Sequence, residues 1–360
     1  MGTIKEVACR AGVSVGTVSN VLNGVAVSAK LRARVQRAID ELNFHPNHVA
    51  SSLKARRTRT LGMVISDITN PFFPRLVRGA EDAALKHGYV ITIVNTDDQL
   101  DRERKAFSLL RSRRVDGALA VIGPNPGGDF QHLKDTITAG IPVVFLDRTT
   151  PGIRADAVLV DNVKGALVCV RHLVSMGHRR VGIVTGAATL QTAKDRQTGY
   201  EMALQEAGIP VLPELIREGD FRFESGYREA KSLLLDHPRP TAIFVANGTM
   251  GLGACKAVQE LGLVCPGDIA VAVFDDVPGA DVFRPTLTVV SQPAYRQGLE
   301  ATELLLRRIN GAIESDEPVT VRLDTELTIR DSTSFRLTAT DRATLPRASR
   351  RTLAETPRLR

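Results

Sequence analysis

Long apolar runs are missing from this chain of 360 residues, and no window resembles a secretory signal or a membrane-spanning segment. The opening MGTIKE also lacks the Ser or Thr that N-myristoylation requires. Cysteine is scarce, and the four cysteines form no metal-ligand spacing: Cys9, Cys169, Cys255 and Cys265. We therefore expect reduced thiols in a cytoplasmic protein that contacts no membrane and binds no metal.

Catalytic motifs are also lacking. GPNPGGD (123–129) has no Lys of a phosphate-binding loop, and GLGACK (251–256) has no third Gly of a dinucleotide fingerprint. Asp275 and Asp276 are adjacent carboxylates, but neighbours on an extended strand point to opposite faces. We expect no catalytic residue and no cofactor.

Charge is distributed unevenly along the chain. Residues 1–60 hold ten Lys or Arg against three Asp or Glu, residues 61–330 hold 30 against 34, and residues 331–360 hold seven against three. A basic N-terminal module followed by a mildly acidic body indicates contact with a polyanion. With 43% hydrophobic residues, the chain is long enough for two or more domains.

Three short helices are predicted in residues 1–45. The first begins at a capping box of Thr3 and Glu6 and ends at a left-handed Gly12. The second begins after Ser14 and runs to about residue 22. The third follows Ser28 and has apolar residues at helical spacing, namely Leu31, Val35, Ile39 and Leu42.

The second helix carries small polar residues on its outer side. Its apolar residues turn inward, which leaves Gly16, Asn20 and Asn23 in one row. Two short helices joined around a Gly have the spacing of a helix-turn-helix, whose second helix enters the DNA major groove. A plain three-helix bundle would show the same periodicity, but the local positive charge favours DNA.

The stretches TIKEVACRAGVSVGTVSNVLNG (3–24) and FHPNHVASSLKARRTRTLGMVISDITNPFF (44–73) resemble the LacI/GalR family of bacterial transcription regulators, from Thr3 to about Thr333. The resemblance implies that Val15 and Gly16 select bases. It places further residues of the same motif near the DNA, namely Ser14, Thr17, Ser19 and Asn23.

Asn20 stands where the family usually has Arg. Arg suits the edge of guanine and Asn suits the edge of adenine, so a different operator base is expected here. A phosphate contact of Asn20 is the alternative.

Residues 46–60 are expected to form a hinge helix and linker. The segment 48–53 is too short to be a stable helix alone. The resemblance implies that it folds on a palindromic operator, where the two copies in a homodimer insert Leu53 into the minor groove. The hinge residues assigned to DNA are Asn47, Val49, Ala50, Leu53, Lys54 and Arg56.

Beyond residue 60, apolar runs of strand length alternate with helical patterns. The runs are LGMVI, YVITIV, GALAVI, PVVFL, RVGIV, TAIFVA and IAVAVF. This alternation predicts parallel sheets covered by helices. GAEDAALKHG (79–88) and GYEMALQEAG (199–208) share the pattern G-x-E-x-A-x-x-x-x-G, which favours two similar halves.

The expected fold is a small all-α helix-turn-helix DNA-binding domain (1–45) plus an α/β effector domain (61–333). The resemblance implies that the effector domain has two doubly wound parallel-sheet subdomains of the periplasmic-binding-protein type. The N-lobe is expected at about 61–160 and 291–320, and the C-lobe at about 161–290 and 321–333. Residues 334–360 contain two prolines and no leucine heptad, so we expect a disordered basic tail.

Polar and aromatic residues follow the predicted strands, at the edge where ligands of open parallel sheets bind. The candidates for effector binding are Asn70, Phe72, Phe73, Asp147, Arg148, Arg196, Phe221, Asn247, Asp275 and Gln292, with Asp67 also near the first strand. Any one of them has a plainer explanation as a helix cap. Their convergence on one cleft indicates a polyhydroxylated ligand, since carboxylates, Arg and amides bind hydroxyls and aromatic faces cover sugar C–H groups.

The resemblance also implies an effector class. Seven of these positions, Asp147 to Gln292, match residues that hold sugars in ribose-type binding proteins and related regulators. Purine-binding relatives carry an extra Arg where this chain has Leu190. Gly248 and Val273 depart from the family pattern, where Asp and Gly are usual.

These observations predict a DNA-binding transcription regulator, a repressor, controlled by a monosaccharide or polyol. The alternative effectors are a purine or a phosphorylated metabolite. A solute-binding protein is the alternative class, but that class needs a signal peptide, whereas this chain begins with the DNA module.

Overall fold

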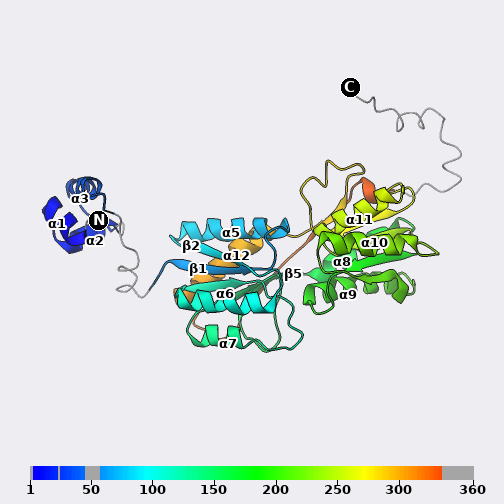
Figure 1. The fold of residues 1–360 in the computed structure, drawn as a ribbon, viewed down its shortest axis with the longest axis horizontal. Helices are drawn as coiled ribbons and strands as arrows, with labels where there is room; N and C mark the ends of the chain where they lie inside the picture. Colours follow the sequence, from blue (N-terminus) through cyan, green and yellow to red (C-terminus); the bar gives the residue numbers. More distant parts are fainter. Residues whose placement is uncertain (1–2, 23–24, 45–56, 335–360) are drawn as a thin grey trace, which may run out of the picture. The chain divides into compact units, whose positions relative to one another are not determined.

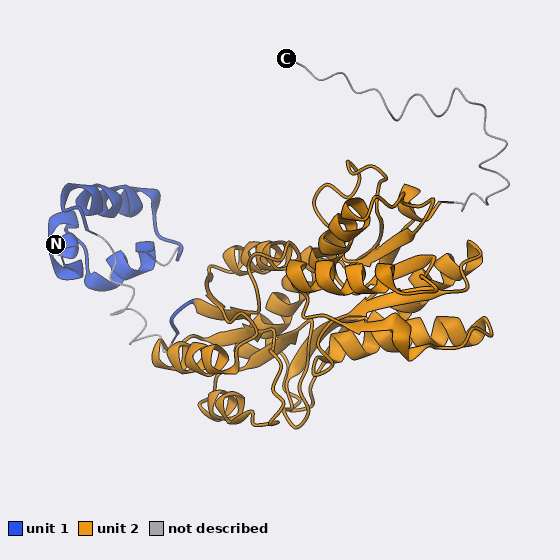
Figure 2. Ribbon diagram, turned by 45° about the vertical axis from the view of Figure 1, so that its right-hand side comes forward, with its two compact units in different colours: residues 1–59 blue, residues 60–360 orange. Residues whose placement is uncertain are grey.

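The structure is a computed structural model that describes residues 3–22, 25–44 and 57–334. It divides into two compact units, residues 1–59 and 60–360 (Figure 2). Several predicted DNA contacts lie outside the described residues, namely Asn23, Asn47, Val49, Ala50, Leu53, Lys54 and Arg56. The same holds for the expected tail from residue 335 onward.

The first unit consists of three helices: α1 (Ile4–Ala11), α2 (Val15–Leu22) and α3 (Ala29–Glu41). The predicted capping box is present, since the Thr3 hydroxyl accepts from the Glu6 N–H and the Glu6 carboxylate accepts from the Thr3 N–H. Gly12 ends α1 with a φ of 63°, as predicted. Ser28 caps α3 by accepting from the Leu31 N–H.

The three helices enclose a small core. Val7, Val18 and Val35, one from each helix, are fully buried in it. The Arg34 guanidinium of α3 donates to the carbonyls of Ala11 and Gly12 at 2.6 and 3.1 Å, which ties α3 to the turn between α1 and α2. The apolar packing and the Arg34 hydrogen bonds fix the direction in which α2 presents its outer side.

The second unit contains two six-stranded sheets, each flanked by helices (Figure 1). The first sheet is parallel throughout, in the order β11 (Thr320–Leu323), β5 (Asp156–Val160), β4 (Val143–Leu146), β3 (Gly117–Ala120), β1 (Thr60–Ile65), β2 (Val90–Asn95). The second has the order β12 (Glu326–Thr328), β10 (Thr288–Ser291), β9 (Ala270–Phe274), β8 (Ala242–Val245), β6 (Val181–Thr185), β7 (Ile216–Glu218). Seven of these strands are the apolar runs predicted above.

Helices cover both faces of each sheet, which is why the central strands are apolar on both sides. Leu61, Met63 and Ile65 of β1 pack toward α5 and α12, whereas Val64 packs toward α6. The helices of the first lobe are α5 (Phe72–Lys86), α6 (Leu100–Ser112), α7 (Gln131–Thr138) and α12 (Ala294–Ile309). Those of the second lobe are α8 (Asn162–Ser175), α9 (Gln191–Glu206), α10 (Phe223–Leu235) and α11 (Gly248–Glu260).

Three chain segments pass between the lobes, as expected, but one passes later than predicted. The crossings follow β5, β10 and β11. Residues 321–323, which the sequence predicts in the C-lobe, belong to β11 and pair with β5 of the first sheet. Ser291 likewise ends β10 in the second sheet, where it pairs with Glu326 of β12. These boundaries depend on which strand each segment pairs with, and the local sequence pattern does not show that partner.

The second sheet departs from purely parallel pairing at one edge, where β12 runs antiparallel to β10. Three short 3-residue elements, β7, β12 and the final turn of helix at Asp331–Thr333, give too little pattern for a prediction. The four cysteines are free thiols, and burial raises the pKa of Cys169 to about 12. No described helix is long and apolar enough to cross a membrane.

Candidate functional site

One pocket lies between the two lobes of the second unit, and its wall contains all ten residues singled out from the sequence. The lining residues are Asn70, Phe72, Phe73, Asp147, Arg148, Thr192, Arg196, Phe221, Asn247, Asp275 and Gln292. The first five belong to the N-lobe, and Gln292 lies in a crossing segment. The cavity that remains between these side chains measures about 20 Å³, close to the minimum that holds one water.

The two Asp residues of the pocket have unusual backbones. Asp147 directly follows β4 with a φ of 61°, and Asp275 directly follows β9 with a φ of 76°. Phe221, in the loop after β7, has a φ of 67°. Left-handed backbone is uncommon outside Gly, and for a bulky residue such as Phe it is a strained conformation that tends to occur at functional sites. Each turn directs its side chain into the space between the lobes.

Arg196 is held from several sides within the C-lobe. Its Nε donates to Asn162 Oδ1 at 2.9 Å, and its Nη1 donates to the Ala246 carbonyl at 2.6 Å. The guanidinium lies over the Phe274 ring, 3.8 Å from its centroid, and Nη1 lies 3.9 Å from an Asp275 oxygen. Burial lowers the pKa of Arg196, although Asp275 and Asp147 oppose that shift. These contacts leave the guanidinium one fixed orientation.

Arg148 is the corresponding cation of the N-lobe. Its Nη1 donates to Asp98 at 2.7 Å and to Ser66 at 3.2 Å, and its Nε lies 3.4 Å from Asp147. Burial lowers the pKa of Arg148, but the charges of Asp98 and Asp147 outweigh burial and raise the pKa overall. Arg148 is therefore a permanent charge close to the pocket.

The aromatic ring of Phe221 lies close to both cations. The guanidinium of Arg148 is 5.9 Å from its centroid, and that of Arg196 is 5.7 Å away. Because Arg148 and Phe221 come from opposite lobes, this stack bridges the cleft. The other two aromatic residues, Phe72 and Phe73, begin α5 and pack edge to face at 5.1 Å. The pocket thus has aromatic walls on both lobes.

Several polar atoms of the pocket have no hydrogen-bond partner in the described structure. They are Asp147 Oδ1, Gln292 Oε1 and Arg148 Nε. Gln292 Nε2 donates to Asp275 Oδ1 at 2.5 Å, which leaves the Gln292 oxygen unused. Buried polar atoms without partners are rare in native proteins, and in a pocket they are the atoms a ligand would bind.

Some candidates also have the plainer structural role. Asn247 caps α11 by accepting from the Met250 N–H, and its amide donates to the Phe221 carbonyl. Asp67 makes only a local turn, in which it accepts from the N–H and hydroxyl of Thr69, and it does not line the pocket. Asp67 therefore drops out of the candidate set.

Thr192 lines the pocket but was not singled out from the sequence. It lies in the first turn of α9 and is buried, one helical turn before Arg196. Since residues four apart share a helix face, the position of Arg196 would have identified Thr192.

Asp275 and Asp276 do not lie on an extended strand as predicted, because β9 ends at Phe274 and Asp275 has a left-handed backbone. Their side chains nevertheless face different surroundings. Asp276 faces Arg75 of the N-lobe at 3.9 Å and Arg330 at 3.8 Å, while Asp275 faces the pocket.

The outer side of α2 in the first unit has the predicted character. Gly16, Asn20 and Val15 are exposed, with Val15 retaining 41% of its surface. Thr17 and Ser19 are half-buried at the edge of this face. Ser14 is occupied with capping, since its hydroxyl accepts from the Thr17 N–H at 3.1 Å. Among the described residues, a Cβ added at Gly16 would meet only Ser14 Oγ, at 3.6 Å, so the face is open toward them.

The chain matches two protein-family models. Residues 3–47 match "Bacterial regulatory proteins, lacI family", and residues 170–333 match "Periplasmic binding protein-like domain". A relative from Edwardsiella ictaluri, the "HTH-type transcriptional repressor PurR", is 36% identical over 323 residues, which span 89% of this chain and 94% of the relative.

Two solved structures are similar over nearly the whole length. The transcriptional regulator CelR in complex with cellobiose is 33% identical, with a TM-score of 0.70, over 92% of this chain and 100% of that chain. The lac repressor dimer bound to operator and the anti-inducer ONPF is 29% identical, with a TM-score of 0.80, over 92% and 99%.

Proposed function

The chain belongs to the lacI family of bacterial regulatory proteins, and from this premise we propose that it is a transcriptional repressor whose operator affinity is set by a monosaccharide or polyol. The observation that carries the effector proposal is the interlobe pocket lined by two carboxylates, two guanidinium groups, three amides and three aromatic rings.

The chemistry of this pocket suits a polyhydroxylated ligand. Asp147 Oδ1 and Gln292 Oε1 accept hydrogen bonds, and Arg148 Nε donates one, so hydroxyl groups acting as both donor and acceptor satisfy all three. The Phe221 ring offers a flat apolar surface for the C–H face of a sugar. A related regulator of known structure holds a sugar, cellobiose.

A purine is the second candidate, because the curated relatives named PurR align with 89–92% of the chain. Against it stands Leu190, which is buried and replaces the Arg that the purine-binding relatives are expected to have. A nonpolar side chain at that position provides no donor for a purine oxygen.

DNA binding is assigned to the outer face of α2, with Val15, Gly16 and Asn20 at the bases. We propose that the protein acts in the cytoplasm as a homodimer on a palindromic operator, like the relative solved as a dimer on operator DNA. In this proposal Leu53 of the hinge inserts into the minor groove. We assign no catalytic role and no cofactor.

Thermodynamic linkage between effector binding and operator binding provides the mechanism of regulation. A ligand that binds one arrangement of the two lobes more tightly than another shifts the population of lobe arrangements. If operator DNA selects among the same arrangements, then the ligand and the operator change each other's affinity by the same factor.

Thermal melting of the purified protein with millimolar neutral monosaccharides, linear polyols and purine bases tests the effector proposal. A ligand at a thousand times its Kd stabilises the folded state by about 4 kcal/mol, which raises the Tm by several degrees. We expect a neutral sugar or polyol to do so in the wild type and in Asp281→Asn, a control outside the pocket, but not in Asp275→Asn. A response to purines alone would overturn the sugar proposal and leave the DNA proposal intact.

A further inference from the structure

A second cavity of about 260 Å³ adjoins the interlobe pocket and shares the Arg148 side chain with it. Its volume is near the lower end of the roughly 300–1,000 Å³ typical of small-molecule sites. The N-lobe contributes the loop that follows β3 and the segment after β4, and the C-lobe contributes the start of α9. The lining residues are Ile122, Gly123, Asn125, Pro126, Gly128, Phe130, Arg148, Thr149, Thr150, Pro151, Thr189, Leu190, Gln191 and Lys194.

The wall of this outer cavity is positively charged. Arg148 and Lys194 line it, and among the described residues no Asp or Glu does. Arg148 is already paired with Asp98 and Asp147. Lys194 is exposed and, within the part of the chain that the structure describes, has no carboxylate at ion-pair distance. The neighbouring Asp195 accepts instead from the Gln191 amide at 2.6 Å.

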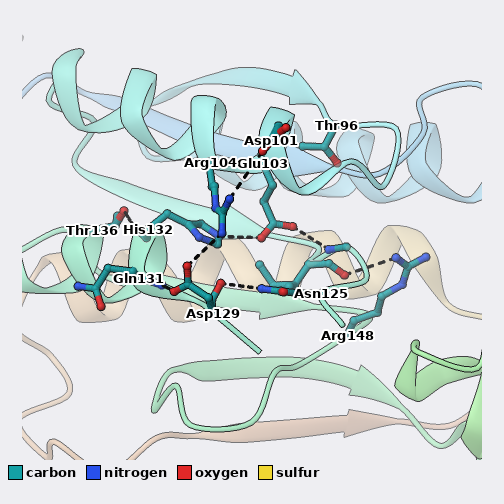
Figure 3. A network of polar contacts seen from close by, with 12 residues as sticks. Thr96, Asp101, Glu103, Arg104, Asn125, Asp129, Gln131, His132, Thr136 and Arg148 are labelled. Carbon is teal, nitrogen blue, oxygen red and sulfur yellow. Dashed lines mark hydrogen bonds and ion pairs between the residues drawn. The ribbon is translucent and has the colours of Figure 1, made fainter. Parts of the chain in front are cut away.

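The acidic residues behind the loop are also engaged (Figure 3). Asp129 pairs with Arg104 at 3.0 Å. Glu103, which is buried, accepts from the Gly123 N–H at 2.8 Å, and its other oxygen lies 2.7 Å from His132 Nε2. These contacts hold the loop in place and leave the Lys194 charge uncompensated in the cavity.

The N-terminus of α9 lies at the same wall. This helix has 16 residues, its N-cap residue Leu190 provides no side-chain cap, and its first turn contains no acidic residue. The free N–H groups and the dipole at such an end attract an anion. A second observation is independent of the helix. Thr150 is 7% exposed and lines the cavity, and its hydroxyl has no hydrogen-bond partner among the residues that the structure describes.

We propose that the outer cavity binds an anionic substituent, a phosphate or a carboxylate, of the effector whose polyhydroxylated part occupies the inner pocket. This inference rests on the proposed function of the inner pocket. Lys194, the α9 N–H groups and the Thr150 hydroxyl are the donors. Arg148, which lines both cavities, lies where the two parts of the ligand join.

Isothermal titration tests the inference with matched ligands: glucose against glucose 6-phosphate, ribose against ribose 5-phosphate, and glucose against gluconate and glucuronate. We expect one anionic sugar to bind at least about 10-fold more tightly than its neutral parent, as a charge-assisted contact provides. Comparison of the sugar phosphates with the sugar carboxylates shows which anion the cavity binds. Lys194→Met should remove most of that preference, and Lys105→Met, an exposed lysine of α6 outside both cavities, should keep it.

Thr150→Val separates a binding role from a structural one. Removing an unpaired buried hydroxyl should leave the Tm equal or higher, because an unsatisfied polar atom is lost at constant shape. The same change should weaken the binding of the anionic sugar by a few-fold. A lowered Tm together with unchanged affinity would overturn the role of Thr150.

Other outcomes contradict the inference in distinguishable ways. If a neutral sugar, or cellobiose, binds as tightly as any anionic sugar and is unaffected by Lys194→Met, the outer cavity is no anion site while the proposed function stands. If no sugar of either kind binds and a purine does, the proposed function fails and this inference fails with it.

Discussion

Asp275 is the residue on which the electrostatics of the pocket depend. It is 8% exposed, and burial raises the pKa of its carboxyl although Arg196 and Gln292 oppose the shift. A hydroxyl donates a stronger hydrogen bond to the ionised carboxylate of Asp275 than to its protonated form. Ligand binding and deprotonation of Asp275 are therefore linked.

The first prediction concerns pH. Since the pKa of Asp275 is raised above the usual Asp range, effector affinity should fall as the pH decreases through that raised value. Isothermal titration between pH 4 and 8 measures it. The Asp281→Asn control should keep the profile, and Asp275→Asn should flatten it. A wild-type affinity that is constant down to pH 4 would contradict the role of Asp275.

The second prediction concerns Arg196. Arg196→Met removes a buried cation and leaves Asp275 without its charge partner, and breaking a buried pair typically costs about 3–5 kcal/mol of unfolding free energy. Adding Asp275→Asn to that variant should recover part of the loss. Urea unfolding of both single variants and the double variant measures the coupling. Additive effects would show that the two side chains do not interact at their 3.9 Å separation.

At the scale of elements, the repeat seen in the sequence has a packing explanation. Gly79 lies in α5 and Gly199 lies in α9, at equivalent places in the two lobes. A Cβ on Gly79 would lie 1.9 Å from the Tyr295 carbonyl of α12, and one on Gly199 would lie 2.3 Å from the Val163 carbonyl of α8. In both lobes the glycine allows two helices on one face of the sheet to approach closely.

The third prediction follows from that contact. Gly79→Ala forces α5 and α12 apart, because the obstructing atoms are backbone and cannot rotate away. The unfolding free energy should fall by about 1–3 kcal/mol or more. Gly127→Ala, whose new Cβ would have nothing closer than Asn125 Oδ1 at 3.7 Å, is the control and should be near neutral. Equal stabilities for the two variants would mean that the helices tolerate the added methyl.

Local signals explain how much of the fold was predictable. Some features depend on only a few neighbouring residues, so the sequence shows them directly. They are the helix caps at Thr3, Gly12 and Ser28 and the seven apolar strands. The end of each strand then indicated which side chains converge on the pocket. The lobe boundary near residue 321 could not be predicted, because β11 is defined by pairing with β5, which is about 160 residues away.

The outer cavity was not predictable for the same reason. Its walls are loops from both lobes, and the loop GPNPGGD shows no motif by itself. Only the fold brings that loop to the start of α9. Thr192, by contrast, is predictable from the sequence, because it lies one helical turn before Arg196 on the same face of α9.

At the scale of the second unit, the pocket is nearly filled. About 20 Å³ remain, and the Arg148, Phe221 and Arg196 side chains occupy the centre. Arg75 with Asp276, and Arg222 with the Asp97 carbonyl, connect the lobes as well. A monosaccharide therefore needs the lobes, or the Phe221 ring, to move. That requirement gives a ligand the means to select a lobe arrangement.

The most direct test of the account is the effect of the effector on operator binding. In vitro selection from random palindromic duplexes supplies the operator, the melting panel supplies the sugar, and fluorescence anisotropy measures operator Kd with and without it. We predict a change of about 5–150-fold, the range of typical allosteric coupling. The operator should change the sugar affinity by the same factor, and Asp275→Asn should lose the response. An operator Kd that is unchanged by a saturating sugar would contradict the account.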